Sequence, residues 1–171
     1  MQRILVTGNA GAGKTSLAHI LANQLDLPYF GLDSIVWKSG WVKTPALERQ
    51  EKELAIINNP AWVVDGVSLT VLDAADMVIF LDYPRYKCFW RALLRNLPYL
   101  FHSRPGLPKH CPEITILPTL VRVIWLFPKH VRPKILAACS NANKYIYHIR
   151  SNDDLEQFLA SADVLTPNIH S

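Results

Sequence analysis

Gly8-Asn9-Ala10-Gly11-Ala12-Gly13-Lys14-Thr15 is the stretch that decides the fold. Its first and last glycines enclose four residues and are followed by Lys-Thr, which is the pattern of a phosphate-binding loop. The apolar run at residues 3–7 predicts a buried strand directly before it. Apolar residues at helical spacing follow, so we expect a helix that begins at or near Lys14 and contains Leu17, Ile20, Leu21 and Leu25.

The residue types in this loop predict a nucleotide site. Glycines let the backbone turn tightly and bring its N–H groups close to phosphate oxygens, and the helix start adds free donors and a positive dipole end. In such loops the lysine reaches the β- and γ-phosphates and the hydroxyl residue holds Mg²⁺. We therefore expect ATP and Mg²⁺ to bind at Gly8, Ala10, Gly11, Ala12, Gly13, Lys14, Thr15 and Ser16.

Length and composition favour one compact domain over residues 1–171. No signal-peptide pattern stands at the N-terminus, and the longest apolar region, residues 114–127, is interrupted by Pro118 and Arg122. It is too short to span a bilayer, so we expect a soluble, cytoplasmic protein. The three cysteines, Cys88, Cys111 and Cys139, are far apart, which favours free thiols over a disulfide framework.

The net charge of +4 is unevenly distributed. Residues 85–134 contain ten Lys or Arg and one acid, a net charge of +9, whereas the rest of the chain contains eight Lys or Arg and thirteen acids, a net charge of −5. A basic block attracts anions. It favours a nucleoside triphosphate with a second phosphorylated substrate, or a nucleic-acid backbone.

Strand and helix signals alternate along the chain. Strands are expected at residues 3–7, 27–30, 62–66, 77–82 and 145–149. Helices are expected at 14–25, 45–58, 85–97, 113–126, 131–142 and 153–160, with Thr44 as the N-cap of the second. This alternation predicts an α/β, three-layer P-loop NTPase fold, in which a five-stranded parallel sheet carries helices on both faces.

Carboxylates follow three of these strands. Asp33, Asp65 and Asp82 come after the second, third and fourth strands, and ligands in parallel sheets bind at the carboxyl ends of the strands. All three should therefore lie near the phosphate loop. Asp65 or Asp82 would hold Mg²⁺ together with Thr15.

Residues 96–133 interrupt the alternation with many prolines. We expect a loop at residues 102–112 between helices. Such an insertion is typical of a lid over a phosphate site. A helical cap that does not move is the alternative.

The residues resemble the adenylate-kinase-like branch of the P-loop kinases, and more closely the DNA topology modulation (FlaR-type) proteins. The matching segments are residues 8–15, 32–37 with 40–41, 62–66, 80–85, 90–91 with 95, and 111–113. The resemblance favours Asp65 slightly over Asp82 for the metal. It also implies that Asp33 binds or deprotonates an acceptor hydroxyl.

Arginines and tryptophans complete the predicted site. Arg91 and Arg95 lie one helical turn apart, and with Arg85, Arg104 and Arg132 they could clamp phosphates. Trp37 and Trp41 could stack on a base, although core packing is the favoured interpretation. The candidate catalytic residues are Lys14, Asp33, Arg91 and Arg132. The candidate substrate-binding residues are Asp33, Trp37, Asp65, Arg91, Arg95 and Arg104.

The sequence thus predicts an ATP- and Mg²⁺-dependent kinase of a nucleotide or another small metabolite, as a monomer or homodimer. One alternative is an NTP-binding regulatory protein that contacts nucleic acid through its basic block and affects DNA topology. Another is a slow P-loop NTPase.

Overall fold

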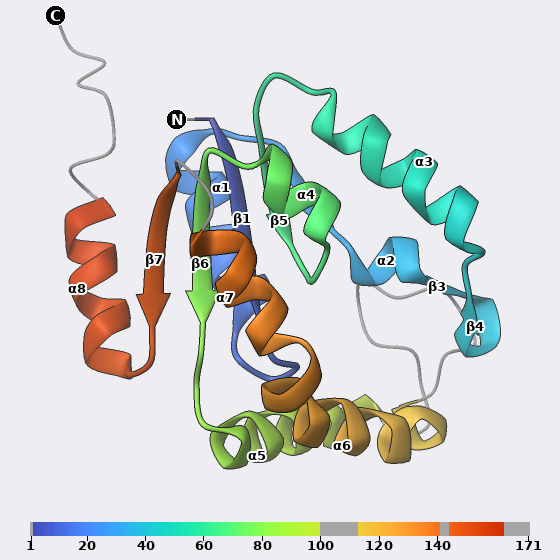
Figure 1. The fold of residues 1–171 in the computed structure, drawn as a ribbon. Coiled ribbons are helices and arrows are strands. Elements are labelled where there is room, and N and C mark those ends of the chain that lie inside the picture. Colours follow the sequence, from blue (N-terminus) through green and yellow to red (C-terminus); the bar gives the residue numbers. More distant parts are fainter. Residues whose placement is uncertain (1, 100–112, 141–143, 163–171) are drawn as a thin grey trace, which may run out of the picture.

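The computed structural model describes residues 2–99, 113–140 and 144–162. Five parallel strands form its main sheet in the order β2-β5-β1-β6-β7 (Figure 1). They are β1 (Arg3–Gly8), β2 (Tyr29–Gly31), β5 (Trp62–Asp65), β6 (Met77–Leu81) and β7 (Tyr145–Ile149). This sheet confirms the predicted fold class.

Helices cover both faces of the sheet. Packed on one face are α1 (Lys14–Leu25) and α8 (Asn152–Ala162). The other face is covered by α3 (Ala46–Ile57), α4 (Leu69–Ala74) and α7 (Arg132–Ser140). The central strands are largely apolar on both faces, since residues 4–6 of β1, 62–64 of β5 and all of β6 are buried hydrophobic residues.

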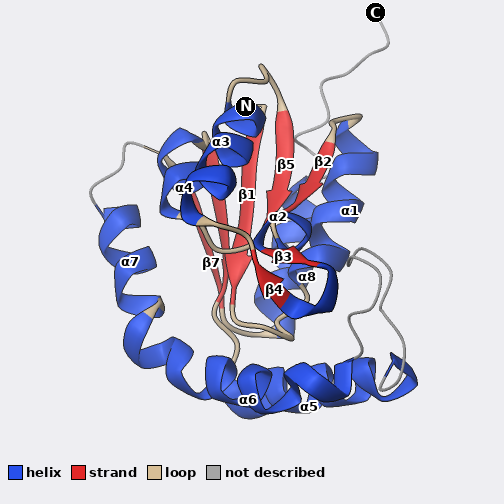
Figure 2. Ribbon diagram, turned by 90° about the vertical axis from the view of Figure 1, so that its right-hand side faces the viewer, coloured by secondary structure: helices blue, strands red, loops and turns tan. Residues whose placement is uncertain are grey.

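Two further segments lie at the carboxyl ends of the strands. One contains α5 (Arg85–Asn96), the 3₁₀ turn η2 (Leu97–Tyr99) and α6 (Glu113–His130), and its helices cross this end of the sheet (Figure 2). The other contains α2 (Asp33–Val36), η1 (Ser39–Trp41) and a small hairpin of β3 (Trp37–Lys38) and β4 (Val42–Lys43). Together these segments enclose the edge where the strands end.

Several predicted boundaries were wrong. The second strand begins at Tyr29, and α3 begins at Ala46 with Pro45, not Thr44, as its N-cap. The Thr44 N–H instead bonds to the Val36 C=O at 3.0 Å, which holds residue 44 against α2. Short elements α2, β3, β4 and α4 were not expected. The predicted loop at 102–112 lies outside the described residues.

The largest difference is in α6, which continues to His130 with Pro118 and Pro128 inside it. The sequence predicted an end near residue 126, because proline removes a helical hydrogen bond.

Among the described residues no single helix is long and apolar enough to cross a bilayer, although the bent pair Ile114–His130 and Arg132–Ser140 together meets the requirements of length and composition.

Gly11 provides a test of how tightly the glycine loop packs. Its φ is +78°, and a Cβ there would lie 2.1 Å from the Cys88 carbonyl oxygen. Gly13 has φ +97°, but a Cβ there would meet nothing within 4 Å. We expect Gly13→Ala to cost about 1–2 kcal/mol from its backbone conformation alone. Gly11→Ala should cost about 1–3 kcal/mol more, since α5 must move. Urea unfolding of both variants measures the difference, and equal costs would contradict this packing.

Candidate functional site

The glycine loop joins β1 to α1 in a tight turn. The Ala12 N–H bonds to the Asn9 C=O at 3.2 Å, and Gly8 has φ +147°. A Cβ at Gly8 would lie 2.4 Å from the Leu81 carbonyl oxygen, so the loop starts pressed against the end of β6. Only glycine fits this close approach. The sequence pattern therefore matches a steric requirement of the fold.

Lys14 folds back over this loop. Its Nζ donates to the Asn9 C=O at 2.9 Å. Burial lowers the pKa of Lys14, while the negative charges of Asp33 and Asp65 oppose the shift and the positive charge of Arg95 adds to it. Lys14 thus lies among the charged groups that the sequence predicted to surround a phosphate.

Asp65 is held beside the loop. The Thr15 Oγ1 donates to its Oδ2 at 2.5 Å, and the Tyr29 hydroxyl donates to its Oδ1 at 2.9 Å. Asp65 ends β5 in register with Val6 of β1, so its neighbour in the sheet leads directly into the loop. A threonine hydroxyl beside a carboxylate is an oxygen pair that fits Mg²⁺. The described residues contain no cluster of three or more His, Cys, Asp or Glu arranged to hold a metal, so phosphates and water would have to complete the coordination of an ion here.

A cavity of about 1100 Å³ extends from the loop to the two segments that lie at the carboxyl ends of the strands. Its wall combines loop residues, the β2–α2 segment, the hairpin and parts of α3, β5, α5 and α6. The predicted residues in this wall are Ala10, Gly11, Gly13, Lys14, Thr15, Ser16, Asp33, Trp37, Asp65, Arg91 and Arg95. The structure therefore brings most of the predicted site into one space.

Trp37 and Trp41 both line the cavity, so the favoured core interpretation was wrong for them. Their rings meet edge to face, with centroids 5.4 Å apart and an interplanar angle of 86°. Trp41 has φ +59°, an uncommon conformation for a bulky residue. Such strain persists where the surroundings enforce it, frequently at functional sites. The β3–β4 hairpin and its turn thus place two contacting tryptophan rings at the cavity wall.

Arg91 and Arg95 reach the cavity wall from α5, one turn apart as predicted. The Arg91 guanidinium lies 4.8 Å from the Tyr83 ring centroid and donates to the Asn152 Oδ1 at 3.2 Å. Arg95 donates from Nε to the neighbouring Asn96 Oδ1 at 3.2 Å. Both guanidinium groups are therefore oriented by neighbours.

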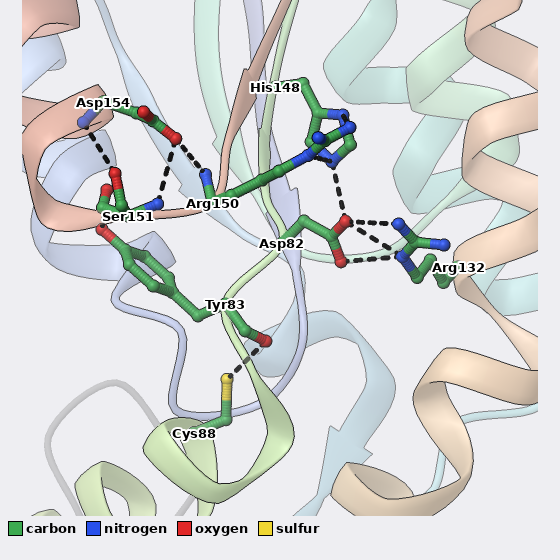
Figure 3. A network of polar contacts seen from close by, with 8 residues as sticks. All are labelled: Asp82, Tyr83, Cys88, Arg132, His148, Arg150, Ser151 and Asp154. Carbon is green, nitrogen blue, oxygen red and sulfur yellow. Dashed lines mark hydrogen bonds and ion pairs between the residues drawn. The ribbon is translucent and has the colours of Figure 1, made fainter.

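Asp82 and Arg132 do not line the cavity. Arg132 donates from Nε to both Asp82 oxygens at 2.9 Å and from Nη2 to Oδ2 at 2.8 Å, and His148 Nε2 lies 2.7 Å from Oδ2 (Figure 3). Burial alone would raise the pKa of Asp82, but the hydrogen bonds from Arg132 and His148 outweigh it and lower the pKa. This pair ties α7 to the sheet, which makes a structural role the better interpretation for both residues.

The remaining predicted residues are placed as follows. Gly8 and Ala12 support the loop without lining the cavity. The Arg85 guanidinium lies 4.7 Å from the Trp125 ring centroid. Arg104 lies outside the described residues.

Sequence reasoning missed several cavity residues. These are Tyr29, Phe30, Ser34, Lys52 and Thr119, among others. Tyr29 and Phe30 lie on β2, so the rule that ligands bind at strand ends could have found them. Lys52 and Thr119 are on helices that only tertiary packing brings to the cavity, and no local pattern marks them.

No protein-family model matches the sequence, and no curated protein is significantly similar to it. Solved structures with a similar fold include shikimate kinase from Acinetobacter baumannii in complex with shikimate (TM-score 0.61, 18% identity, covering 100% of this chain and 96% of that chain). A second is shikimate kinase from Bacteroides thetaiotaomicron (TM-score 0.56, 16% identity, covering 96% of this chain and 97% of that chain). A third is a sugar kinase from Janibacter sp. HTCC2649 (TM-score 0.52, 15% identity, covering 96% of this chain and 95% of that chain).

These structures show that this chain has the same fold as the shikimate kinases and the sugar kinase. Their low sequence identity carries the similarity no further than the fold. None of the three is described as a DNA topology modulation protein, so the narrower resemblance remains a prediction.

The Asp82–Arg132 pair predicts a specific dependence of stability on pH. The folded-state pKa of Asp82 is lowered, so its stabilising contribution is complete above the unfolded pKa of about 3.9 and is lost as the pH falls through the folded value. Asp82→Asn should therefore cost about 1–3 kcal/mol at pH 7. The cost should shrink as the pH falls below about 3.9, because the unfolded chain then takes up a proton that folded Asp82 does not, and it should vanish below the folded pKa. Urea unfolding between pH 3 and 7 measures it, with the exposed Glu51→Gln as control. A cost independent of pH would contradict the assignment.

Proposed function

We propose that this protein is a Mg²⁺-dependent phosphotransferase that transfers the terminal phosphoryl group of ATP to a hydroxyl group of a small acceptor. The observation that supports it best is the shared cavity, in which the loop, Asp33, Asp65, Arg91 and Arg95 line one space. Phosphoryl transfer depends mainly on positioning and charge neutralisation, and these groups meet both needs.

The loop side of the cavity suits the phosphoryl donor. Backbone N–H groups and Lys14 would take the triphosphate, since loops of this kind bind phosphates through these groups. Thr15 and Asp65, already joined at 2.5 Å, would hold Mg²⁺, directly or through water. The ion would neutralise charge on the transferring phosphoryl group.

The opposite side suits an acceptor with a hydroxyl, a body with apolar or planar surface, and a negative charge. Asp33 provides a carboxylate to orient or deprotonate the hydroxyl. Trp37 and Trp41 offer aromatic surface, and Arg91 and Arg95 offer guanidinium groups that match phosphate or carboxylate oxygens. A nucleotide or another small phosphorylated metabolite combines these features.

A nucleic-acid partner is less well supported. The prediction of such a partner depended on the ten Lys and Arg of the basic block, and four of these ten have separate roles in the structure. Arg132 pairs with Asp82, Arg85 lies over Trp125, and Arg91 and Arg95 line the cavity. A backbone of phosphates is bound better by basic side chains that share one continuous surface.

The test is a thermal-shift screen of nucleotides and metabolites with Mg²⁺, followed by ATP turnover with any metabolite that adds to the ATP shift. We expect acceptor-stimulated turnover that falls at least about 100-fold in Lys14→Ala, as when one electrostatic group is removed from a transition state. Lys129→Ala is the matched control, because it removes an exposed basic residue outside the cavity.

Three results would argue against a kinase. No shift with any triphosphate would exclude the donor site. ATP turnover that no metabolite stimulates would favour a slow NTPase. DNA binding with a steep salt dependence that is unchanged in Lys14→Ala would favour the nucleic-acid function.

Asp33→Asn refines a positive result, since it should retain ATP binding and lose about 100-fold or more in turnover.

A further inference from the structure

Asn9 links the loop to a helix far away in the sequence. Its side chain is buried, with the residue 2% exposed, and its Nδ2 donates to the Ile124 C=O at 3.0 Å. Its Oδ1 accepts the Ala10 N–H at 2.8 Å. Ile124 lies inside α6, so this amide connects a loop residue to the backbone of a helix 115 positions later.

Pro128 explains why a helical carbonyl accepts this bond. In an α-helix the C=O of residue 124 would take the N–H of residue 128, and proline has none. Ile124 is 1% exposed, and its bond to Asn9 is buried. A buried carbonyl without a donor is costly, and the Asn9 amide supplies the donor that the proline removed.

The other helical proline offers a contrast. Pro118 leaves the C=O of Ile114 without its helical donor in the same way, but Ile114 is 46% exposed. Water can reach a carbonyl at an exposed position, so no side-chain amide is needed there. Pro118 is therefore a matched control for Pro128, because both prolines lie in α6 and only Pro128 frees a buried carbonyl group.

Asn9 also contacts the lysine of the loop, because its C=O accepts the Lys14 Nζ at 2.9 Å. On the other side of the link, α6 contributes Ile116, Thr119, Leu120 and Val123 to the cavity wall. One residue thus joins the part of the loop that would sense a triphosphate to the helix that covers the acceptor space.

We propose that Asn9 is a positioning residue that couples occupancy of the loop to the placement of α6, and that Pro128 makes the coupling possible by freeing the Ile124 carbonyl. The coupling rests on the proposed function, since it requires a triphosphate at the loop. The bond itself does not, so the two can fail separately.

The bond is tested by hydrogen exchange of α6 amides in the protein without nucleotide, using Asn9→Ala, Pro128→Ala and the double variant. Asn9→Ala should speed exchange near residues 124–130 about tenfold, because a buried carbonyl loses its donor. In the Pro128→Ala background the new N–H can replace Asn9, so the same change should have an effect below about twofold. With Pro118→Ala the effect of Asn9→Ala should stay tenfold.

The coupling is tested by adding MgATP. In the wild type it should slow exchange in both the start of α1 and α6, and in Asn9→Ala only in α1. If Asn9→Ala speeds exchange near residues 124–130 equally in the wild-type and Pro128→Ala backgrounds, the role of the bond is overturned and the proposal with it. Equal protection of α6 by MgATP in wild type and Asn9→Ala would overturn the coupling. If MgATP does not bind the wild type, the proposed function and the coupling both fail, while the exchange measured without nucleotide still decides the bond.

Discussion

The close approach of the glycine loop to its neighbours is the constraint on which the site depends. Gly8 lies against the Leu81 carbonyl at the end of β6, and Gly11 lies against the Cys88 carbonyl in α5. A side chain at either position would push the loop away from the sheet or from α5. Because α5 also carries Arg91 and Arg95, this packing sets the distance between the loop side of the cavity and the two guanidinium groups.

Charge in the protein is organised in local pairs around this packing. Asp65 receives hydrogen bonds from Thr15 and Tyr29 beside the loop, and Asp82 receives them from Arg132 at the start of α7. Asp65 is the last residue of β5 and Asp82 directly follows β6, the two strands beside β1, yet only Asp65 lines the cavity. Two carboxylates at corresponding ends of the strands on either side of β1 therefore have different surroundings: Asp65 is a candidate metal ligand, and Asp82 anchors α7.

The sequence predicted the sheet well, because buried parallel strands leave continuous apolar runs and helices follow them with period 3.6. It also predicted that the loop, Asp33 and Asp65 lie in one site, because each directly follows or ends a strand in the sequence. It could not distinguish Asp82, since the partner that neutralises it, Arg132, is 50 positions away. It ended α6 too early, because the donor that offsets Pro128 comes from Asn9 near the N-terminus. Core packing was favoured for Trp37 and Trp41, because residue type alone does not show that the β3–β4 hairpin places both of them at the cavity wall.

The most direct test of a triphosphate site at the loop is a ¹H–¹⁵N NMR titration of the wild-type protein with MgATP. If the loop binds the triphosphate, the largest shift changes will be in the backbone amides of residues 10–16, because these N–H groups would donate to phosphate oxygens. Changes confined to other surfaces, or unchanged loop amides at millimolar MgATP, would contradict it.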